Sequence, residues 1–312
     1  MAHWYDQIRP KFVSNVANKY LLDNEFDAFQ VFPKVNSRQL SGYVAKYDKA
    51  DWLKIGTVND YKRIGATESV GEGYEVDKQL YTLEEFAFHY DITKDDAKEY
   101  DNPFDPVNDA VDFVMQRLRR VLLQNVVNSI LTTGVWGTDH NETSSKWDAK
   151  TSGVSDVDPV DKVMTWAEEI EKVTGFTPNR AIIAADVFRA LKGNTHIMNR
   201  MKTTNDKVVT VGLLAKLFEL DKIYIANAVN SDATDYMVNG SMLLYYVPDR
   251  PSKFKPAAAY HITYKGRGGN NIITRRIPMP HLNDALRIEA SVKSQLVVLA
   301  TDLGVYAYNL TS

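Results

Sequence analysis

The most regular pattern of hydrophobic positions lies near the middle of the chain. Between residues 107 and 130, apolar side chains recur every three or four positions, which places them on one face of a helix. Asp105 and Pro106 form a strong start signal, because aspartate caps free amides and proline costs nothing at the first helical position. Gly134 supplies the stop, so the pattern predicts one helix over 105–133, about 43 Å long. The residues predicted to face a sheet are Val111, Val114, Leu118 and Val121.

The segment after this helix alternates between helices and short apolar strands. A second helix is predicted to start at Asp158-Pro159 and to stop at Gly175. A buried strand follows over 181–185, and Asp186 is placed to cap a short helix behind it. The alternation predicts a compact block of helices around a sheet. Its remaining elements are a helix over 212–220 and a strand over 222–226.

Strands dominate the rest of the chain. Apolar and smaller or polar residues alternate over 86–92, which is the period of a half-buried strand. Asn239-Gly240 is typical of a tight hairpin turn between strands over 236–238 and 242–246. The polar stretch over 136–155 predicts an exposed loop. The other predicted strands span 42–47, 258–264, 271–277, 285–292, 295–300 and 305–310.

The first 85 residues lack a clear core face. Residues 1–30 are polar and aromatic, and two interpretations stay open: a frayed terminus, or an arm that packs on a neighbouring molecule. Residues 31–85 hold many strand formers, with glycines at 65, 71 and 73. This combination suits a long hairpin that finds its packing partner elsewhere.

Composition and charge exclude several classes of protein. The chain has 312 residues, 44% of them hydrophobic, and its 37 basic and 40 acidic side chains leave a net charge of −3. Composition therefore gives no support to a role in coating nucleic acid or in polybasic membrane binding. The absence of cysteine rules out disulfide scaffolds, thiolate zinc sites and cysteine nucleophiles. No apolar run approaches the roughly 20 residues of a membrane span, and no signal peptide is seen.

No pattern in the sequence identifies a catalytic, cofactor-binding or metal-binding residue. The six histidines (His3, His89, His140, His196, His261 and His281) are scattered without ligand spacing, and each is expected to be structural. The glycine-rich run over 266–270 lacks the following helix that a phosphate site needs, so a mobile basic turn is the preferred interpretation. An enzyme hypothesis therefore has no positive residue evidence.

The order of the predicted elements resembles the major capsid proteins of tailed bacteriophages, which share the HK97-like fold with encapsulins and herpesvirus capsid floors. Two local patterns add to the resemblance. Residues 130–134 end the long helix in a glycine, and residues 179–188 run from a strand directly into a short helix. The resemblance implies an α+β fold with an N-terminal arm, an extended hairpin called the E-loop, a peripheral domain with a long spine helix, and an axial α/β domain.

Carried onto this chain, the family layout divides it into five segments. The N-terminal arm is expected over 1–30 and the E-loop over 31–85. The peripheral domain is expected over 86–157, with the spine helix at 105–133. The axial domain would span 158–260, and strands over 261–312 would complete both domains.

The resemblance also implies a function. The chain would be a structural protein, not an enzyme, that self-assembles through pentamers and hexamers into an icosahedral shell around double-stranded phage DNA, which it contacts non-specifically. It would be assembled in the host cytoplasm, become part of the virion, need no cofactor and contact no membrane.

Two departures from the family bear on partners. With the arm starting near Met1, no room is left for the cleaved scaffolding segment of some members. A separate scaffolding protein is therefore expected, together with a portal and a possible decoration protein. Lysines 46, 49, 54 and 62 lie in the predicted E-loop, but the crosslinking chemistry of some members is not assigned to them.

Two alternatives stay open. The first is an encapsulin-type nanocompartment, which shares the fold and encloses cargo protein instead of a genome. The second is a cytoplasmic α/β enzyme without a recognisable motif, which predicts small closed oligomers and a convergent polar pocket.

Overall fold

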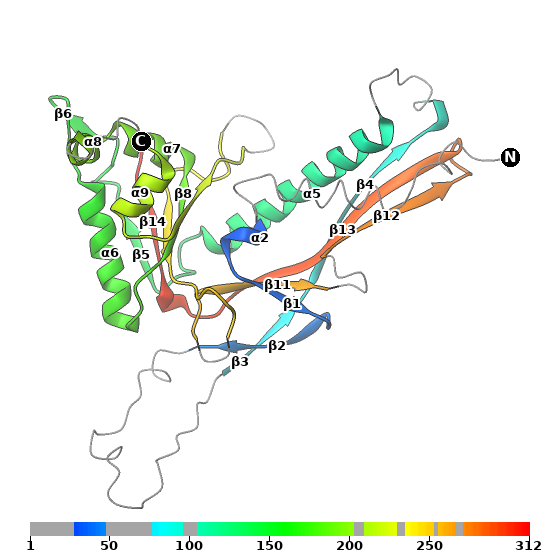
Figure 1. Ribbon diagram of the computed structural model, residues 1–312, viewed down its shortest axis with the longest axis horizontal. Coiled ribbons are helices and arrows are strands. Elements are labelled where there is room, and N and C mark those ends of the chain that lie inside the picture. The colour runs from blue at the N-terminus through cyan, green and yellow to red at the C-terminus, as the bar shows by residue number, and fades with distance from the viewer. Residues whose placement is uncertain are drawn as a thin grey trace, which may run out of the picture.

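The computed structural model describes residues 28–47, 77–95, 105–202, 209–229, 235–252, 255–265 and 271–312. Two five-stranded sheets organise these residues. In Figure 1 the first, long sheet extends to the right with helix α5 along it, and the second sheet lies to the left among the helices that follow α5.

The long sheet is built around one strand, β13 (Ala285–Val298). On one side β13 pairs antiparallel with β4 (Glu84–Ile92), and on the other it pairs first with β12 (Ile272–Met279) and then with β11 (Ala259–Tyr264). A short strand, β1 (Lys34–Ser37), adds to β11 in parallel. The sequence predicted two strands over 285–292 and 295–300, and this is wrong. Ser294 is paired with both Glu84 and Thr263, so the ladder passes from one set of partners to the next without a break.

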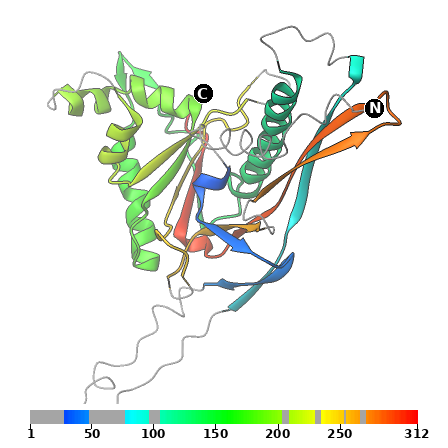
Figure 2. The ribbon, with the colours of Figure 1, turned by 45° about the vertical axis from the view of Figure 1, so that its right-hand side comes forward.

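Helix α5 (Pro106–Ile130) packs on β4 and β13, as Figure 2 shows. The predicted start is confirmed, since the Asp105 side chain accepts a hydrogen bond from the Val107 amide at 3.0 Å. The helix ends at Ile130, three residues before the predicted end. Val111, Val114 and Leu118 are buried as predicted, but Val121 is 47% exposed, because the buried stripe continues at Leu122 instead. At this turn of the helix the buried face is therefore formed by Leu118 and Leu122.

The second sheet has the order β5-β14-β10-β8-β9. These strands span Thr138–Asn141 (β5), Gly304–Tyr308 (β14), Met242–Tyr245 (β10), Arg180–Ala184 (β8) and Lys222–Ala226 (β9). The predicted hairpin at Asn239-Gly240 is wrong, because β10 pairs antiparallel with β14 and β8 and not with the preceding segment. Tyr236 forms only an isolated bridge, to Val229. Gly240 adopts a φ of +55° at a bend of the backbone, so the glycine signal marks the point where the chain enters a central strand.

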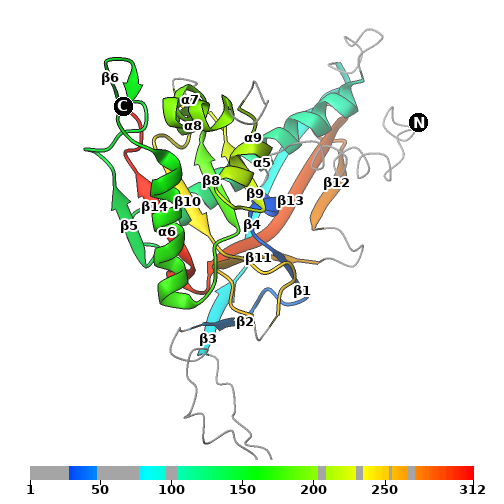
Figure 3. The same ribbon diagram turned by 60° about the vertical axis from the view of Figure 1, so that its left-hand side comes forward.

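Four helices accompany the second sheet: α6 (Pro159–Thr174), α7 (Ala185–Gly193), α8 (Thr195–Lys202) and α9 (Val211–Leu217). Figure 3 shows α6 across β14, with α7 and α8 at one end of the sheet. The predicted start and stop of α6 are confirmed, since Asp158 caps its first turn and Gly175 ends it in a left-handed conformation. The predicted cap at Asp186 is wrong. Its carboxylate accepts bonds from the Gly240 amide (2.7 Å) and the Thr311 hydroxyl (2.5 Å), and it thereby ties α7 to the C-terminal segment.

The stretch over 136–155 is not the exposed loop that its polarity predicted. It contains β5 and a small ribbon formed by β6 (Lys150–Thr151) and β7 (Val154–Ser155). Trp136 and Trp147 are both buried, and the Trp136 indole N–H donates to the Ile130 carbonyl at 2.7 Å. Two isolated tryptophans thus anchor a segment whose average composition is polar.

The start of the described chain is held between both sheets. Helix α2 (Ala28–Val31) offers backbone carbonyls to three side chains. Its first residue accepts from the His261 ring (2.9 Å), Gln30 from the Tyr224 hydroxyl (2.7 Å) and Val31 from the Tyr245 hydroxyl (2.8 Å). Val31 is fully buried, so the prediction that residues 31–85 lack a core face is wrong at their beginning.

Two further strands, β2 (Ser41–Lys46) and β3 (Asp77–Thr82), form a separate antiparallel ribbon. Residues 1–27 and 48–76 lie outside the described residues, and with them most of the predicted arm and the far part of the predicted E-loop, including the glycines at 65, 71 and 73. The division into domains stays a prediction. The pairing of β5 with β14 does place 138–141, assigned to the peripheral domain, in the same sheet as the axial segment.

None of the described helices combines the length and the apolar character needed to cross a membrane.

Candidate assembly surfaces

The β2–β3 ribbon presents a bare apolar face. Tyr43 and Leu80 are directly opposite each other across the two strands, and they are 70% and 59% exposed. A two-stranded ribbon is marginally stable on its own, and opposed apolar side chains are what normally pack when another layer covers such a ribbon. The pair is therefore a candidate contact for another molecule.

The opposite side of the ribbon is fixed to the body of the protein. Tyr81 and Leu83 are buried, the Tyr47 amide donates to the Leu299 carbonyl at 3.2 Å, and the Thr82 amide donates to the Gln295 side chain at 2.8 Å. Within the ribbon, Gly42 leaves room for the side chain of its partner Tyr81, because a Cβ there would lie 2.7 Å from the Tyr81 hydroxyl. The ribbon is thus held in place while its outer face stays open.

A cluster of aromatic rings lies where the long sheet meets the outer edge of α5. The Phe113 ring makes edge contacts with Phe88 (5.9 Å between centroids) and Tyr90 (5.4 Å), and all three side chains remain partly exposed. The predicted strand over 86–92 is confirmed, but its apolar face is only partly covered. Beside the cluster, Arg287 donates two 2.7 Å bonds to Asp91, and this guanidinium lowers the pKa of the Asp91 carboxyl. The ion pair helps to fix the register of β4 on β13.

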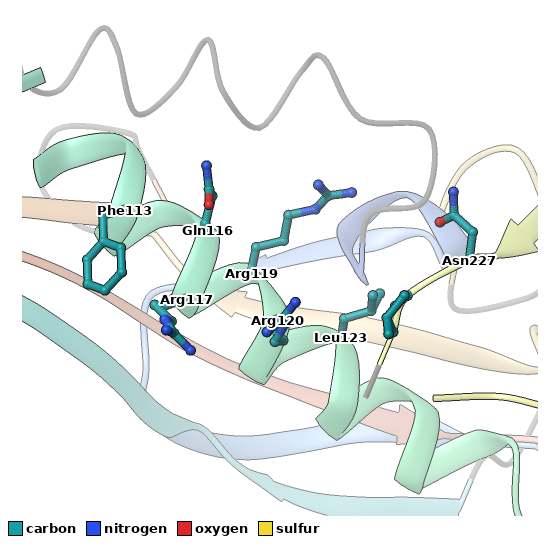
Figure 4. A pocket seen from close by; sticks show the side chains of 9 residues that line it. Phe113, Gln116, Arg117, Arg119, Arg120, Leu123 and Asn227 are labelled. Atoms are coloured by element: carbon teal, nitrogen blue, oxygen red, sulfur yellow. The ribbon is translucent and has the colours of Figure 1, made fainter. Parts of the chain in front are cut away.

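A basic cavity of about 370 Å³ lies on the solvent side of α5, facing the segment after β9. Figure 4 shows three arginines along one stretch of the helix, with Arg119 reaching toward Asn227 and with Arg117 and Arg120 beside it. Their meeting with Asn227 depends on how the two sheets are placed, which no local pattern reports.

The described histidines lie in separate environments, and His3 lies outside the described residues. His140 is 2.7 Å from Glu169 and stacks on Trp166, while His196 contacts the Ser155 carbonyl at 2.9 Å. Burial lowers the pKa of His261 to about 4. Within the described ranges no group of three or more His, Asp or Glu side chains could hold a metal ion. Of the four lysines weighed for crosslinking, Lys46 is exposed on β2; Lys49, Lys54 and Lys62 lie outside the described residues, as does the glycine-rich run over 266–270.

Comparison with known sequences gives one clear relative. No family model matches the chain. The chain is 27% identical over 128 residues to the major capsid protein of Burkholderia phage BcepMu. This alignment covers 38% of this chain and 41% of that protein, so the chain spans less than half of the length of the curated relative it matches.

Comparison with solved structures covers almost the whole chain. A phage-related protein from Bordetella bronchiseptica RB50 matches 99% of this chain and 98% of its own, with a TM-score of 0.72 and 18% identity. The match to the capsid structure of cyanophage P-SCSP1u covers 93% of this chain and 90% of that one, with a TM-score of 0.54 and 14% identity. The match to an encapsulin complex from Synechococcus elongatus PCC 7942 covers 98% of this chain and 89% of that one, also with a TM-score of 0.54, at 12% identity.

These matches define the class of protein first: the chain has the α+β fold of viral and virus-like shell proteins, as predicted. Within that class it resembles the major capsid proteins of tailed phages, which confirms the resemblance drawn from the order of its elements. The named relatives are structural proteins and not enzymes, in agreement with the predicted class of function.

Proposed function

We propose that this chain is the major capsid protein of a tailed phage, and that its copies assemble through pentamers and hexamers into an icosahedral shell around double-stranded DNA. The observation that carries the proposal is the match of nearly the whole chain to a phage-related protein at a TM-score of 0.72. Sequence similarity to a phage major capsid protein supports it independently.

The open faces of the molecule suit this role. Tyr43 and Leu80 on the ribbon, and the Phe88–Tyr90–Phe113 cluster at the sheet edge, are too small to hold a stable dimer alone. In a closed shell each such contact is repeated many times, and subunits that cover one another's open surfaces gain stability together. We propose a separate scaffolding protein, a portal and a possible decoration protein as further partners, and the virion as the location of the assembled protein.

The test is the assembly state of the purified full chain. Mass photometry and negative-stain imaging, with and without the scaffolding protein of the same phage, should show shells or capsomers of five and six copies. Only monomers or dimers under both conditions would contradict the proposal.

An encapsulin-type shell is the second candidate, favoured by the match of 98% of this chain to the Synechococcus complex. The contents of particles isolated from the natural host separate the two functions. Nuclease-protected DNA of one defined length supports a phage capsid, whereas a single co-purifying protein and no DNA supports a nanocompartment.

A further inference from the structure

A second, larger cavity continues the basic cavity beside α5. It has a volume of about 1400 Å³ and is lined by residues of α7, α9 and β9. The two cavities share Arg119, Asn227 and Val229, so they form one continuous hollow between the long helix and the edge of the second sheet. We call this hollow the basic groove.

The charge of the basic groove is opposite to that of the whole protein. The chain carries a net charge of −3, yet six basic side chains line the groove and Asp221 is the only carboxylate among its described lining residues. The six are Arg117, Arg119, Arg120, Arg189, Lys192 and Lys222. Such a concentration of one sign in a hollow focuses a positive potential on whatever occupies it.

Four of these cations rest on aromatic rings. The charged groups lie 5.2 Å (Arg117 on Phe113), 5.2 Å (Arg189 on Tyr236), 4.3 Å (Lys192 on Phe188) and 4.6 Å (Lys222 on Tyr224) from the ring centroids. A cation–π contact stabilises a side-chain position without neutralising its charge. The described part of the chain offers these four no carboxylate partner, in contrast to Arg200 and Arg287, which each form an ion pair.

The arrangement also limits how a ligand can bind. Each of the four rings already has a cation over one face, so the rings are poorly available to stack on nucleobases. What the groove offers is a set of pre-positioned positive charges, the chemistry that recognises phosphate oxygens independently of sequence.

We propose that the basic groove is the surface through which this protein contacts the phosphate backbone of double-stranded DNA. The inference rests on the proposed function, which supplies the DNA, and it adds the site and the mode of contact. The contact is electrostatic, insensitive to sequence and strongly dependent on salt.

The test compares two triple variants of the full chain that remove the same charge. The groove variant is Arg117→Gln, Arg120→Gln and Lys192→Gln, and the control is Lys150→Gln, Lys172→Gln and Lys265→Gln; all six positions are exposed. Binding of a short labelled DNA duplex of mixed sequence is measured by fluorescence anisotropy at several salt concentrations. If each groove cation neutralises one phosphate, the slope of log affinity against log salt falls by up to about 2.7 in the groove variant. The affinity at low salt should fall at least about tenfold, while the control stays within about twofold of the natural chain.

Three outcomes would overturn the proposal. Equal losses in both variants would mean that only overall charge matters. Tighter binding of a poly-glutamate peptide than of duplex DNA would identify the groove as a site for an acidic protein. Loss of capsomers in the groove variant alone, with DNA binding unchanged, would make the groove an interface between copies. Because assembly is followed separately by mass photometry, a chain that binds DNA through the groove but forms no shell would contradict the proposed function and not this inference.

Discussion

The two sheets of this protein are covered to very different degrees. In the second sheet all four residues of β10 are buried, as are four of five in both β8 and β14. In the long sheet only Ile92 is buried among the nine residues of β4, and only Ile272 among the eight of β12. The middle strands of the second sheet are therefore fully covered, whereas β4 and β12, which flank β13 in the long sheet, leave much of their surface exposed. This difference predicts where substitutions damage the fold and where they damage assembly.

The largest effect is expected where the long sheet does have a core, under α5. Leu118→Asp places an unpaired charge among buried apolar side chains and should lower the free energy of unfolding by about 4 kcal/mol. The matched control is Val121→Asp, three residues along the same helix on its exposed side, which should cost less than about 1 kcal/mol. Urea unfolding of both variants measures the difference, and similar costs would show that the helix presents a different face to the sheet.

A smaller effect is expected from deleting side-chain volume in the covered sheet. Leu244→Ala in β10 removes a fully buried side chain and should cost about 3 kcal/mol, because the packed surroundings cannot close the cavity. Tyr90→Ala in β4 removes a larger but partly exposed side chain and should cost about 1 kcal/mol. Thermal unfolding of the two variants ranks them, and a larger loss for Tyr90→Ala would break the comparison between the sheets.

Lowering the pH should reduce the free energy of unfolding by about 2 kcal/mol, through His261, the histidine that joins the long sheet to α2. Burial lowers the pKa of His261 from 6.5 to about 4, with Lys34 nearby as a further disfavouring charge. Between these values the unfolded chain binds a proton that the folded chain does not, so stability is fully present above pH 6.5 and is lost as pH falls toward 4. Between pH 7 and pH 5 the loss from this group should be about 2 kcal/mol. His261→Gln removes the titrating group, and an unchanged pH dependence in that variant would assign the loss to other residues.

The smallest effect on folding, and a large one on assembly, is expected at the β2–β3 ribbon. Tyr43→Ser combined with Leu80→Ser removes exposed side chains, so the unfolding free energy should change by less than about 0.5 kcal/mol while particle formation is lost. The control is Val154→Ser with Met198→Ser, two exposed apolar residues beside the second sheet. Particle yield by mass photometry decides the matter, and normal particles from the ribbon variant would exclude this face from assembly.

The elements that the sequence predicts best are those in which local signals agree with packing. The starts of α5 and α6 follow from Asp-Pro pairs whose aspartates do cap the first turn. The run over 181–185 was predicted as a buried strand, and residues 181–184 do form one, while Ala185 already begins α7. The strand is buried because β10 and β9 flank it in the same sheet. Here local propensity and tertiary context point the same way.

The predictions that fail are those in which a distant partner decides the outcome. The Asn239-Gly240 signal does coincide with a bend of the backbone, but β10 pairs with β8 and β14 because those strands supply a fully covered ladder. Asp186 caps no helix, since the Gly240 amide and the Thr311 hydroxyl compete for its carboxylate. The basic groove could not be predicted either, because its cations come from α5, α7 and β9, which are far apart along the chain.

The hydrogen bonds to the α2 carbonyls also determine when, during synthesis of the chain, this helix can be fixed in place. They join residues 194, 214 and 233 positions apart, so these three bonds form only when strands from the later part of the chain are present. At roughly 5 to 20 residues per second, about 10 to 45 seconds of synthesis separate α2 from its last partner. Throughout that interval the three α2 carbonyls lack their final side-chain donors. Helix α2 is consequently among the last described elements to gain all its hydrogen bonds, and an incomplete chain cannot hold it in its final position.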